Sequence, residues 1–170
     1  MKILETERLR LRHLTPDDLD DLWALYSDPA ITRFIPDAPR NYAEARAELE
    51  WHQHGHPRHS ELGLWATIHK PSGQFSGRCG LLPWTLDGVD EVEVAYTIAR
   101  PYWGQGLATE AACAIRDYAF AKLSLTRLVC LIDGENRASA RVAEKIGMSF
   151  ERAAEDEIGP FLLYSMERPA

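Results

Sequence analysis

The sequence has 170 residues, of which 45% are hydrophobic and 26% charged, a balance typical of a water-soluble globular protein with its own core. Its formal net charge of −7 disfavours binding to the backbone of nucleic acids, which needs basic patches, and favours a cationic partner such as an amine. The odd number of cysteines, without framework spacing, predicts free thiols in a reducing compartment such as the cytoplasm: Cys79, Cys113 and Cys130.

The N-terminal segment MKILETERLRLRHL is charged throughout and lacks the apolar region of a secretory signal peptide. No apolar run reaches the length of a membrane span, so no membrane partner is expected. There is no repeat, low-complexity stretch or linker. The sequence therefore predicts a single domain over residues 1–170, and it leaves a homodimer open.

The first half of the chain predicts a strand, two helices and a hairpin. Leu9 and Leu11 alternate with arginines, as in a half-buried strand. Thr15 then opens a helix as its N-cap, Pro16 takes the first helical position, and Asp28-Pro29 stops the helix. We further predict an irregular segment over 31–40, a helix over 42–52, and paired strands at 62–68 and 75–82.

The segment His52–His59 holds four histidines, and imidazole is a common metal ligand. It contains no acid or cysteine, however, and Gly55 and Pro57 make it a loop. We expect a loop beside the substrate rather than a metal site.

The second half begins with a strand over 91–98. Its alternation places Val92, Val94, Tyr96 and Ile98 on one face, and Glu91, Glu93, Ala95 and Thr97 on the other. A helix over 108–122 and a continuous apolar strand over 127–132 follow. Asn136 then caps a helix that stops at Gly147, and two closing strands lie near 150–151 and 161–166.

The glycine-rich turn between strand 91–98 and helix 108–122 carries the clearest chemical signal. A strand, a glycine turn and a helix start direct free N–H groups and the helix dipole toward one point, which suits an anion. Gly104 and Gly106 have no Cβ to keep a phosphate from the backbone, and Gln105 brings no negative charge. Neither GxxxxGK[ST] nor GxGxxG is present, because Thr109 stands where a third glycine would be. A simple connecting turn is the alternative interpretation.

The run Tyr-Trp-Gly-Gln-Gly-Leu-Ala-Thr-Glu-Ala resembles the acetyl-CoA pyrophosphate loop of the GNAT N-acetyltransferases. It is most similar to the Rim-type branch, which includes the ribosomal-protein-alanine N-acetyltransferases. In the family pattern Gln/Arg-x-x-Gly-x-Gly/Ala, Trp103 takes the first place, which departs from the general pattern but suits this branch. Gly106 and Ala108 take the two small positions. The chain's opening, from Thr6 to Thr15, resembles the same branch.

The resemblance covers nearly the whole chain and implies the α/β (α+β) GNAT fold, a mixed, mostly antiparallel sheet of about seven strands, splayed in the middle, with about four helices. It implies acetyl-CoA as co-substrate and no metal. The expected cofactor contacts are Ile98, Trp103, Gly104, Gln105, Gly106, Leu107, Ala108, Thr109 and Asn136. The first two helices would wall the acceptor side, so the histidine loop could touch the substrate.

Acetyl transfer to an amine requires loss of the ammonium proton, stabilisation of the carbonyl oxygen and protonation of the leaving thiolate. No GxSxG and no close Cys/His pair supports covalent catalysis, which leaves direct attack by the amine. Glu93 is one candidate base, on a strand that resembles the Rim-type Glu-x-Gly-Tyr-x-Ile, with Ala95 for the glycine. Glu157, in an acidic turn, is the other. The alternative interpretation of Glu93 is an exposed strand glutamate without a catalytic role, and that of Glu157 is a residue of a solvated turn.

For the acid, many family members use a tyrosine in the last helix, but the matching position here is Ala143. The Rim-type branch has Asn-x-x-Ser at the helix start, which Asn136-Arg137-Ala138-Ser139 matches. Ser139 could therefore protonate or hydrogen-bond the thiolate, and Asn136 could cap the helix and hold the pantetheine arm. A backbone N–H of the strand 92–98 would meet the oxyanion.

Three functions remain open from the sequence. The first is acetylation of a protein or peptide N-terminal amine. The second is the same chemistry on a small amine, such as a polyamine, an aminoglycoside or an amino acid. The third is a non-catalytic acyl-CoA sensor. The loops that would choose the acceptor carry no readable signal.

Overall fold

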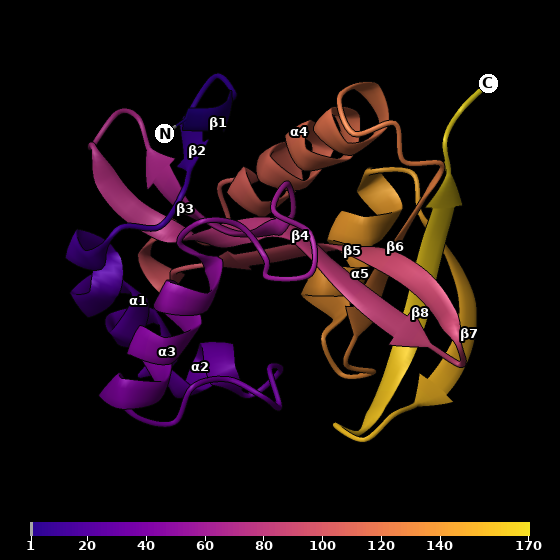
Figure 1. Cartoon of the computed structure of the whole chain (residues 1–170), viewed down its shortest axis with the longest axis horizontal. Coiled ribbons are helices and arrows are strands. Elements are labelled where there is room, and N and C mark those ends of the chain that lie inside the picture. Colours follow the sequence, from indigo (N-terminus) through magenta and orange to yellow (C-terminus); the bar gives the residue numbers. More distant parts are fainter. Residues whose placement is uncertain (1) are drawn as a thin grey trace.

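The computed structural model describes residues 2–170 and has one eight-stranded sheet in the order β1-β2-β3-β4-β5-β6-β8-β7 (Figure 1). The strands are β1 (Lys2–Glu5), β2 (Leu9–Arg12), β3 (Gly63–His69), β4 (Gln74–Leu86), β5 (Val89–Ile98), β6 (Arg127–Ile132), β7 (Ser149–Glu155) and β8 (Pro160–Glu167). The α-helices are α1 (Leu19–Tyr26), α2 (Pro29–Thr32), α3 (Tyr42–His52), α4 (Leu107–Ala121) and α5 (Arg137–Lys145). All neighbouring strands are antiparallel except the parallel pair β5–β6. This mixed architecture confirms the predicted fold class.

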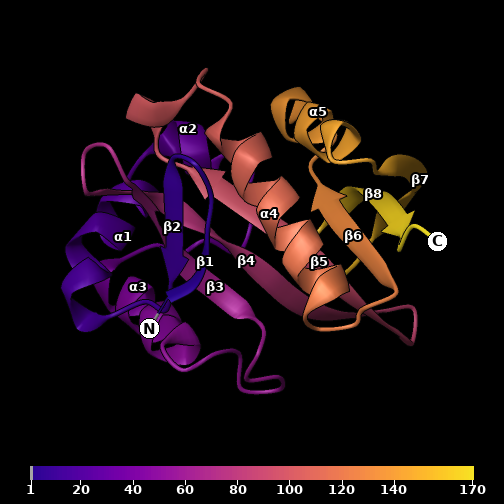
Figure 2. The ribbon, with the colours of Figure 1, turned by 90° about the horizontal axis from the view of Figure 1, so that it is seen from above.

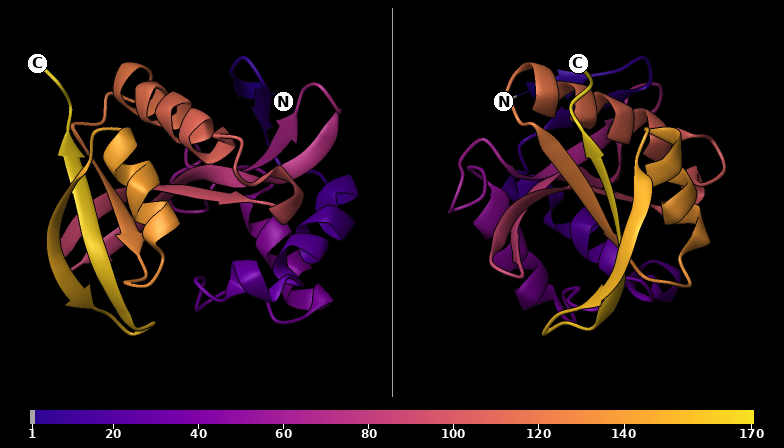
Figure 3. Two further views of the ribbon diagram at one scale, coloured as in Figure 1. Left: turned by 180° about the vertical axis from the view of Figure 1, so that it is seen from behind. Right: turned by 90° about the vertical axis from the view of Figure 1, so that its right-hand side faces the viewer.

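Helices cover both faces of the sheet, with α4 on one side and α1 to α3 on the other (Figures 1 and 3). Leu107 and Ile115 of α4 are buried against Val94 and Ile98 of β5, in the larger of the main cores. The helices α1 to α3 form a second core on the opposite face. The alternation of β5 therefore sends its apolar side chains toward α4 and leaves Glu93, Ala95 and Thr97 toward α1–α3.

The sheet splays between β5 and β6, as the resemblance implied. These strands are paired at one position, Glu93 with Val129, whereas β5 is paired with β4 along its whole length. Figure 2 shows α4 lying across the sheet near this junction. Beyond the paired position β5 runs on to Ile98 with one edge free of β6.

Two elements differ from the sequence-based predictions. Strand β1 was not predicted, because four residues of mixed polarity show no clear alternation; it forms by pairing with β2, where Glu5 binds Arg10 with 2.7 Å between Oε1 and Nε. Helix α2 was not predicted either; it ends inside the segment 31–40, whose residues 33–40 form no helix or strand, as expected. Asp28-Pro29 stops α1 as expected, but it also starts α2, since Asp28 accepts a hydrogen bond from Ala30 N–H at 3.0 Å.

Smaller differences concern the ends of elements. The helix predicted from Thr15 begins with a 3₁₀ turn at Pro16–Asp18 before α1 starts. The closing strand near 150–151 extends over Ser149–Glu155. Among the described residues, none of the helices has the length and apolar character needed to cross a bilayer.

Candidate active site

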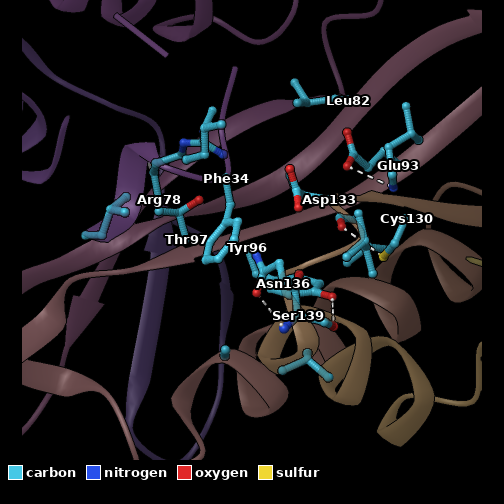
Figure 4. A pocket seen from close by; sticks show the side chains of 18 of the residues that line it. Phe34, Arg78, Leu82, Glu93, Tyr96, Thr97, Cys130, Asp133, Asn136 and Ser139 are labelled. Atoms are coloured by element: carbon cyan, nitrogen blue, oxygen red, sulfur yellow. Dashed lines mark hydrogen bonds between the residues drawn. The ribbon is translucent and has the colours of Figure 1, made fainter. Parts of the chain in front are cut away.

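A cavity of about 860 Å³ lies where β5 and β6 separate. One side of it is lined by the glycine loop, β5, the end of β6 and the start of α5; the other side is lined by residues around α2, by α3 and by β4. This volume lies within the range of small-molecule sites. Figure 4 shows the side chains that meet in the cavity.

The glycine loop ends in a helix N-terminus without a side-chain cap. Gly104 and Gly106 have φ values of +74° and +77°, in the left-handed region that favours glycine, and Gly106 is the N-cap of α4. The first N–H of α4 with a helical acceptor is that of Glu110, bonded to Gly106 O at 3.0 Å. The N–H groups of the first three helical residues thus lack helical partners and can bind an anion: Leu107, Ala108 and Thr109.

Arg8 compensates the negative charge of Glu110, which would otherwise repel an anion bound at the start of α4. Glu110 lies in the first turn of α4, and Arg8 binds it through Nε at 2.7 Å and through its backbone N–H at 2.9 Å. Partial burial favours the neutral acid, but hydrogen bonds from Thr6 and Arg8 lower the pKa of Glu110. Arg8 Nη1 also donates to Gln105 O at 2.9 Å, so the same side chain holds the loop in place.

Most of the predicted cofactor contacts line this cavity: Ile98, Trp103, Gly104, Gly106, Leu107, Ala108, Thr109 and Asn136. Gln105 does not line it; its side chain is exposed and donates to Pro101 O at 3.4 Å. Asn136 caps α5, as predicted, by accepting a hydrogen bond from Ser139 N–H at 3.1 Å. The helix start and the free edge of β5 suit the phosphates and amides of a CoA.

The free edge of β5 is partly occupied by side chains. Ile98 O accepts a hydrogen bond from Trp103 Nε1 at 2.6 Å, and Val94 O accepts one from Cys130 Sγ at 3.3 Å. Because strand groups alternate, the N–H and C=O of Tyr96 point to the same side. The main chain of Tyr96 therefore faces the cavity between the two occupied carbonyls.

Glu93 is partly buried at the point of the splay. Its Oε2 accepts a hydrogen bond from Trp84 Nε1 at 2.7 Å, and its Oε1 accepts one from Leu131 N–H of β6 at 3.3 Å. Burial raises the pKa of Glu93 to about 7, against the opposing effect of these bonds and of Arg78. A carboxyl group with such a pKa exchanges protons near neutral pH, as a general base must.

Ser139 and Tyr96 meet on the α5 side of the cavity (Figure 4). Tyr96 OH donates to Ser139 O at 2.8 Å, whereas no hydrogen bond within residues 2–170 engages Ser139 Oγ. Cys130 is buried beside them, and burial raises the pKa of its thiol, which keeps it protonated. Ala143, the position of the missing helix tyrosine, is buried in the core.

Glu157 lies apart from these groups. It is exposed in the loop between β7 and β8 and does not line the cavity, although its neighbours Asp156 and Ile158 do. Of the four histidines between 52 and 59, His52 and His56 line the cavity. Within residues 2–170 the structure shows no cluster of His, Cys, Asp or Glu side chains suited to a metal ion.

Sequence reasoning gave no role in the cavity to Tyr96 or Arg78, whereas it placed His52 in a segment that could touch the substrate. Tyr96 was placed on the correct face of β5, but its bond to α5 depends on the fold. Arg78 and His52 come from β4 and α3, and no local pattern marks them as neighbours. Only the cross-strand pairing of Arg78 with Thr97 brings it to this cavity.

Comparisons with known proteins agree with this geometry. Residues 8–149 match the family described as the acetyltransferase (GNAT) domain. The uncharacterized protein YkkB of Bacillus subtilis (strain 168) is 33% identical over 162 residues, covering 95% of this chain and 93% of that protein. An acetyltransferase from Agrobacterium tumefaciens str. C58 has a TM-score of 0.80 and 26% identity, covering 99% of this chain and 95% of its own.

A ribosomal-protein-S5-alanine acetyltransferase from Vibrio fischeri has a TM-score of 0.76 at 17% identity, covering 98% of this chain and 96% of its own, and thus shares the fold. The family match, which spans most of the chain, confirms the assignment made from the glycine loop. The chain belongs to the GNAT family of N-acetyltransferases.

Proposed function

We propose that this protein transfers the acetyl group of acetyl-CoA to a primary amine by direct attack within the cavity at the β5–β6 splay. GNAT enzymes use acetyl-CoA as co-substrate and act on amines. The observation that carries the proposal is the meeting, in one cavity, of an uncapped helix N-terminus and a carboxyl group whose pKa is about 7.

The residues present fit this co-substrate. The N–H groups from Gly104 to Thr109 would hold the pyrophosphate, since Arg8 has neutralised the nearby Glu110. The free edge of β5 and the Asn136 side chain would hold the pantetheine arm. When bound, acetyl-CoA supplies a thioester carbonyl carbon and a thiol leaving group.

In this proposal Glu93 takes the proton that the substrate ammonium must lose, directly or through a water molecule. The amine nitrogen then bonds to the carbonyl carbon as the carbon–sulfur bond breaks. Ser139 Oγ, which is not engaged elsewhere, gives or shares a proton with the departing sulfur. The N–H of Tyr96 points to the same space and would stabilise the carbonyl oxygen. Glu157 remains the second-choice base, and its exposed position argues against it.

The acceptor we propose first is the N-terminal amine of a protein or peptide, on the strength of the Rim-type motifs. A small amine is the alternative, and the acidic side chains that line the cavity favour it: Asp37, Asp133 and Asp156. We also propose a cytoplasmic location, because Cys79, Cys113 and Cys130 are all free thiols.

Thiol release from acetyl-CoA tests the function. A peptide library and a panel of polyamines, aminoglycosides and amino acids would serve as acceptors, and mass spectrometry would identify the acetylated amine. Release with at least one acceptor, at a rate that falls in Glu93→Gln, is the expected result. Tight acetyl-CoA binding without release from any acceptor would instead support the non-catalytic sensor.

A further inference from the structure

Four polar side chains cluster on the acceptor side of the cavity: Tyr26 of α1, Glu48 and His52 of α3, and Arg78 of β4. The side chain of Arg78 points toward α1–α3, because its neighbours Cys79 and Leu81 are buried in the α4 core. Arg78 is 7% exposed and His52 is 5% exposed, yet both line the cavity. Buried polar groups of this kind need partners.

Two nitrogen atoms of the Arg78 guanidinium donate to no group among the described residues. Its Nε donates to Tyr26 OH at 2.7 Å, and no hydrogen bond within residues 2–170 uses its Nη1 or Nη2. Within residues 2–170, two side-chain atoms are both shielded from solvent and without a hydrogen-bond partner: His13 Nδ1 and Thr67 Oγ1. The Nη atoms of Arg78 are not among them, so each Nη is at least partly exposed. Since Arg78 lines the cavity, its Nη groups open onto it and present the paired donors that suit a carboxylate.

His52 adds another donor beside Arg78. Its Nδ1 accepts a hydrogen bond from Leu64 N–H at 3.2 Å, which puts the proton of the neutral ring on Nε2. Burial, together with the nearby His56 and the positive charge of Arg78, lowers the pKa of His52 to about 4, so the ring is neutral at pH 7. No bond within residues 2–170 engages His52 Nε2, which is therefore a free N–H donor.

Glu48 limits the charge of the anion that fits. It accepts a hydrogen bond from Tyr26 OH, the same hydroxyl that Arg78 Nε binds, so the charges of Arg78 and Glu48 balance across one hydroxyl group. A doubly charged phosphate would be repelled by Glu48. A carboxylate, with one negative charge and two acceptor oxygens, suits the remaining donors.

Arg78 and Glu93 point to the same face of the paired strands β4 and β5, but they lie apart along these strands. On the paired strands β4 and β5, Arg78 faces Thr97, Gly80 faces Ala95, and Glu93 faces Leu82. Thr97 lies four positions along the strand from Glu93, which places their Cα atoms about 13 Å apart. The small side chain of Ala95, which lines the cavity, lies between the two charged side chains, which Figure 4 shows well apart.

We propose that the acceptor amine also carries a carboxylate, which Arg78 and His52 bind while the amine lies beside Glu93. This inference rests on the proposed function. A free amino acid, or a peptide with an acidic residue near its N-terminus, has this chemistry. Asp37 lines the cavity near Glu93, so the ammonium end of the acceptor meets acids and the carboxylate end meets donors.

Matched substrate pairs test the proposal in the wild-type protein. Each amino acid is compared with its primary amide, and each peptide with Asp or Glu near its N-terminus is compared with the Asn or Gln peptide. We expect kcat/KM for the carboxylate form to exceed that for the amide about 100-fold, mainly through KM. Amino acids and acidic peptides identify the two sources separately. Equal kcat/KM for the two members of every pair would overturn the proposal.

Two conservative variants test the two residues; Arg78→Lys also replaces the Nε donor to Tyr26 OH by a methylene group. Arg78→Lys keeps the positive charge and loses the fork; His52→Asn keeps an acceptor for Leu64 N–H and loses the Nε2 donor. Each should lower the carboxylate preference, the ratio of kcat/KM for the acid to kcat/KM for its amide, at least about tenfold. An unchanged preference in both would assign the cluster a structural role only.

Calorimetry separates this inference from the proposed function. N-acetylated amino acids and their amides are titrated into the wild-type protein with CoA present, which requires no turnover. Tighter binding of the carboxylate form supports the inference even if no amine is acetylated. Acetylation of amines without any such preference would sustain the function and refute the carboxylate site.

Discussion

Replacing Glu93 by glutamine separates its charge from its shape. The side chain is partly buried and accepts hydrogen bonds from Trp84 Nε1 and Leu131 N–H. Glutamine keeps an acceptor for one of these donors, and its NH₂ group faces the other. The variant should therefore fold, with a loss of about 1 kcal/mol in the free energy of unfolding at pH 5, where Glu93 is mostly neutral.

The effect of pH on stability follows from the raised pKa. Burial moves the pKa of Glu93 from 4.5 to about 7, a difference of about 3 kcal/mol. Between these pH values the folded protein binds a proton that the unfolded chain has released. The free energy of unfolding due to Glu93 therefore falls as pH rises from about 4.5 to about 7, and the full cost remains above pH 7. Glu93→Gln lacks this loss, so it should gain about 3 kcal/mol relative to wild type between pH 4 and pH 8.

The pH dependence of activity tests the catalytic role of the same group. In the wild type kcat/KM should rise with pH around 7, as Glu93 loses its proton. In Glu93→Gln this acidic limb should vanish, and kcat/KM at pH 8 should fall about 10² to 10³-fold. Urea unfolding at several pH values measures the effect of Glu93→Gln on the free energy of unfolding. Glu157→Gln, at an exposed residue, is the matched control. If the acidic limb of the kcat/KM profile survives in Glu93→Gln and vanishes in Glu157→Gln, the assignment of Glu93 as the base is refuted.

The remaining predictions concern the loop and the acid. Gly104→Ala should weaken acetyl-CoA binding more than tenfold, ~1.4 kcal/mol by calorimetry, because Gly104 lines the cavity and its φ of +74° is strained for alanine, so the N–H groups of the loop would shift. Gly88→Ala is the control, since Gly88 has a similar φ of +79° in the turn between β4 and β5, at the other end of β5; both variants should lose about 1 to 2 kcal/mol of stability, and equal affinities would contradict the phosphate site. Ser139→Ala should lower kcat about 10- to 100-fold with unchanged acetyl-CoA affinity. Tyr96→Phe should cost less, because its proton is already bonded to Ser139 O; a larger loss in Tyr96→Phe would make the tyrosine the acid.

The elements that sequence reasoning placed correctly carry strong local signals. Strand 91–98 alternates cleanly, the run 127–132 is apolar throughout, and Asn136 caps α5 as its position predicts. Strand β1 is an edge strand held by its pairing with β2, and such pairing leaves little local trace. In α2, the Asp-Pro pair that ends one helix also begins another, so a signal for a stop was also a signal for a start.

Part of the candidate site could also be predicted from the sequence, and part of it depends on tertiary packing. The glycine loop is contiguous in sequence, so its geometry could be predicted from the order of strand, glycines and helix. The Arg78–Tyr26–Glu48 cluster joins three elements separated by dozens of residues, and only tertiary packing creates it. The raised pKa of Glu93 likewise depends on burial between β5 and β6, which a single strand cannot show.

Strand β5 explains why an open sheet can hold a ligand and still be stable. Its pairing with β4 over the full length secures one edge, and at Gly77 the strands approach so closely that a Cβ would lie 2.1 Å from Thr97 O. On the other edge the Cys130 thiol and the Trp103 indole satisfy Val94 O and Ile98 O. These side chains offset part of the cost of the missing strand pairs. The main chain of Tyr96 lies between them, where its C=O would accept an amide N–H of the co-substrate and its N–H would face the carbonyl oxygen.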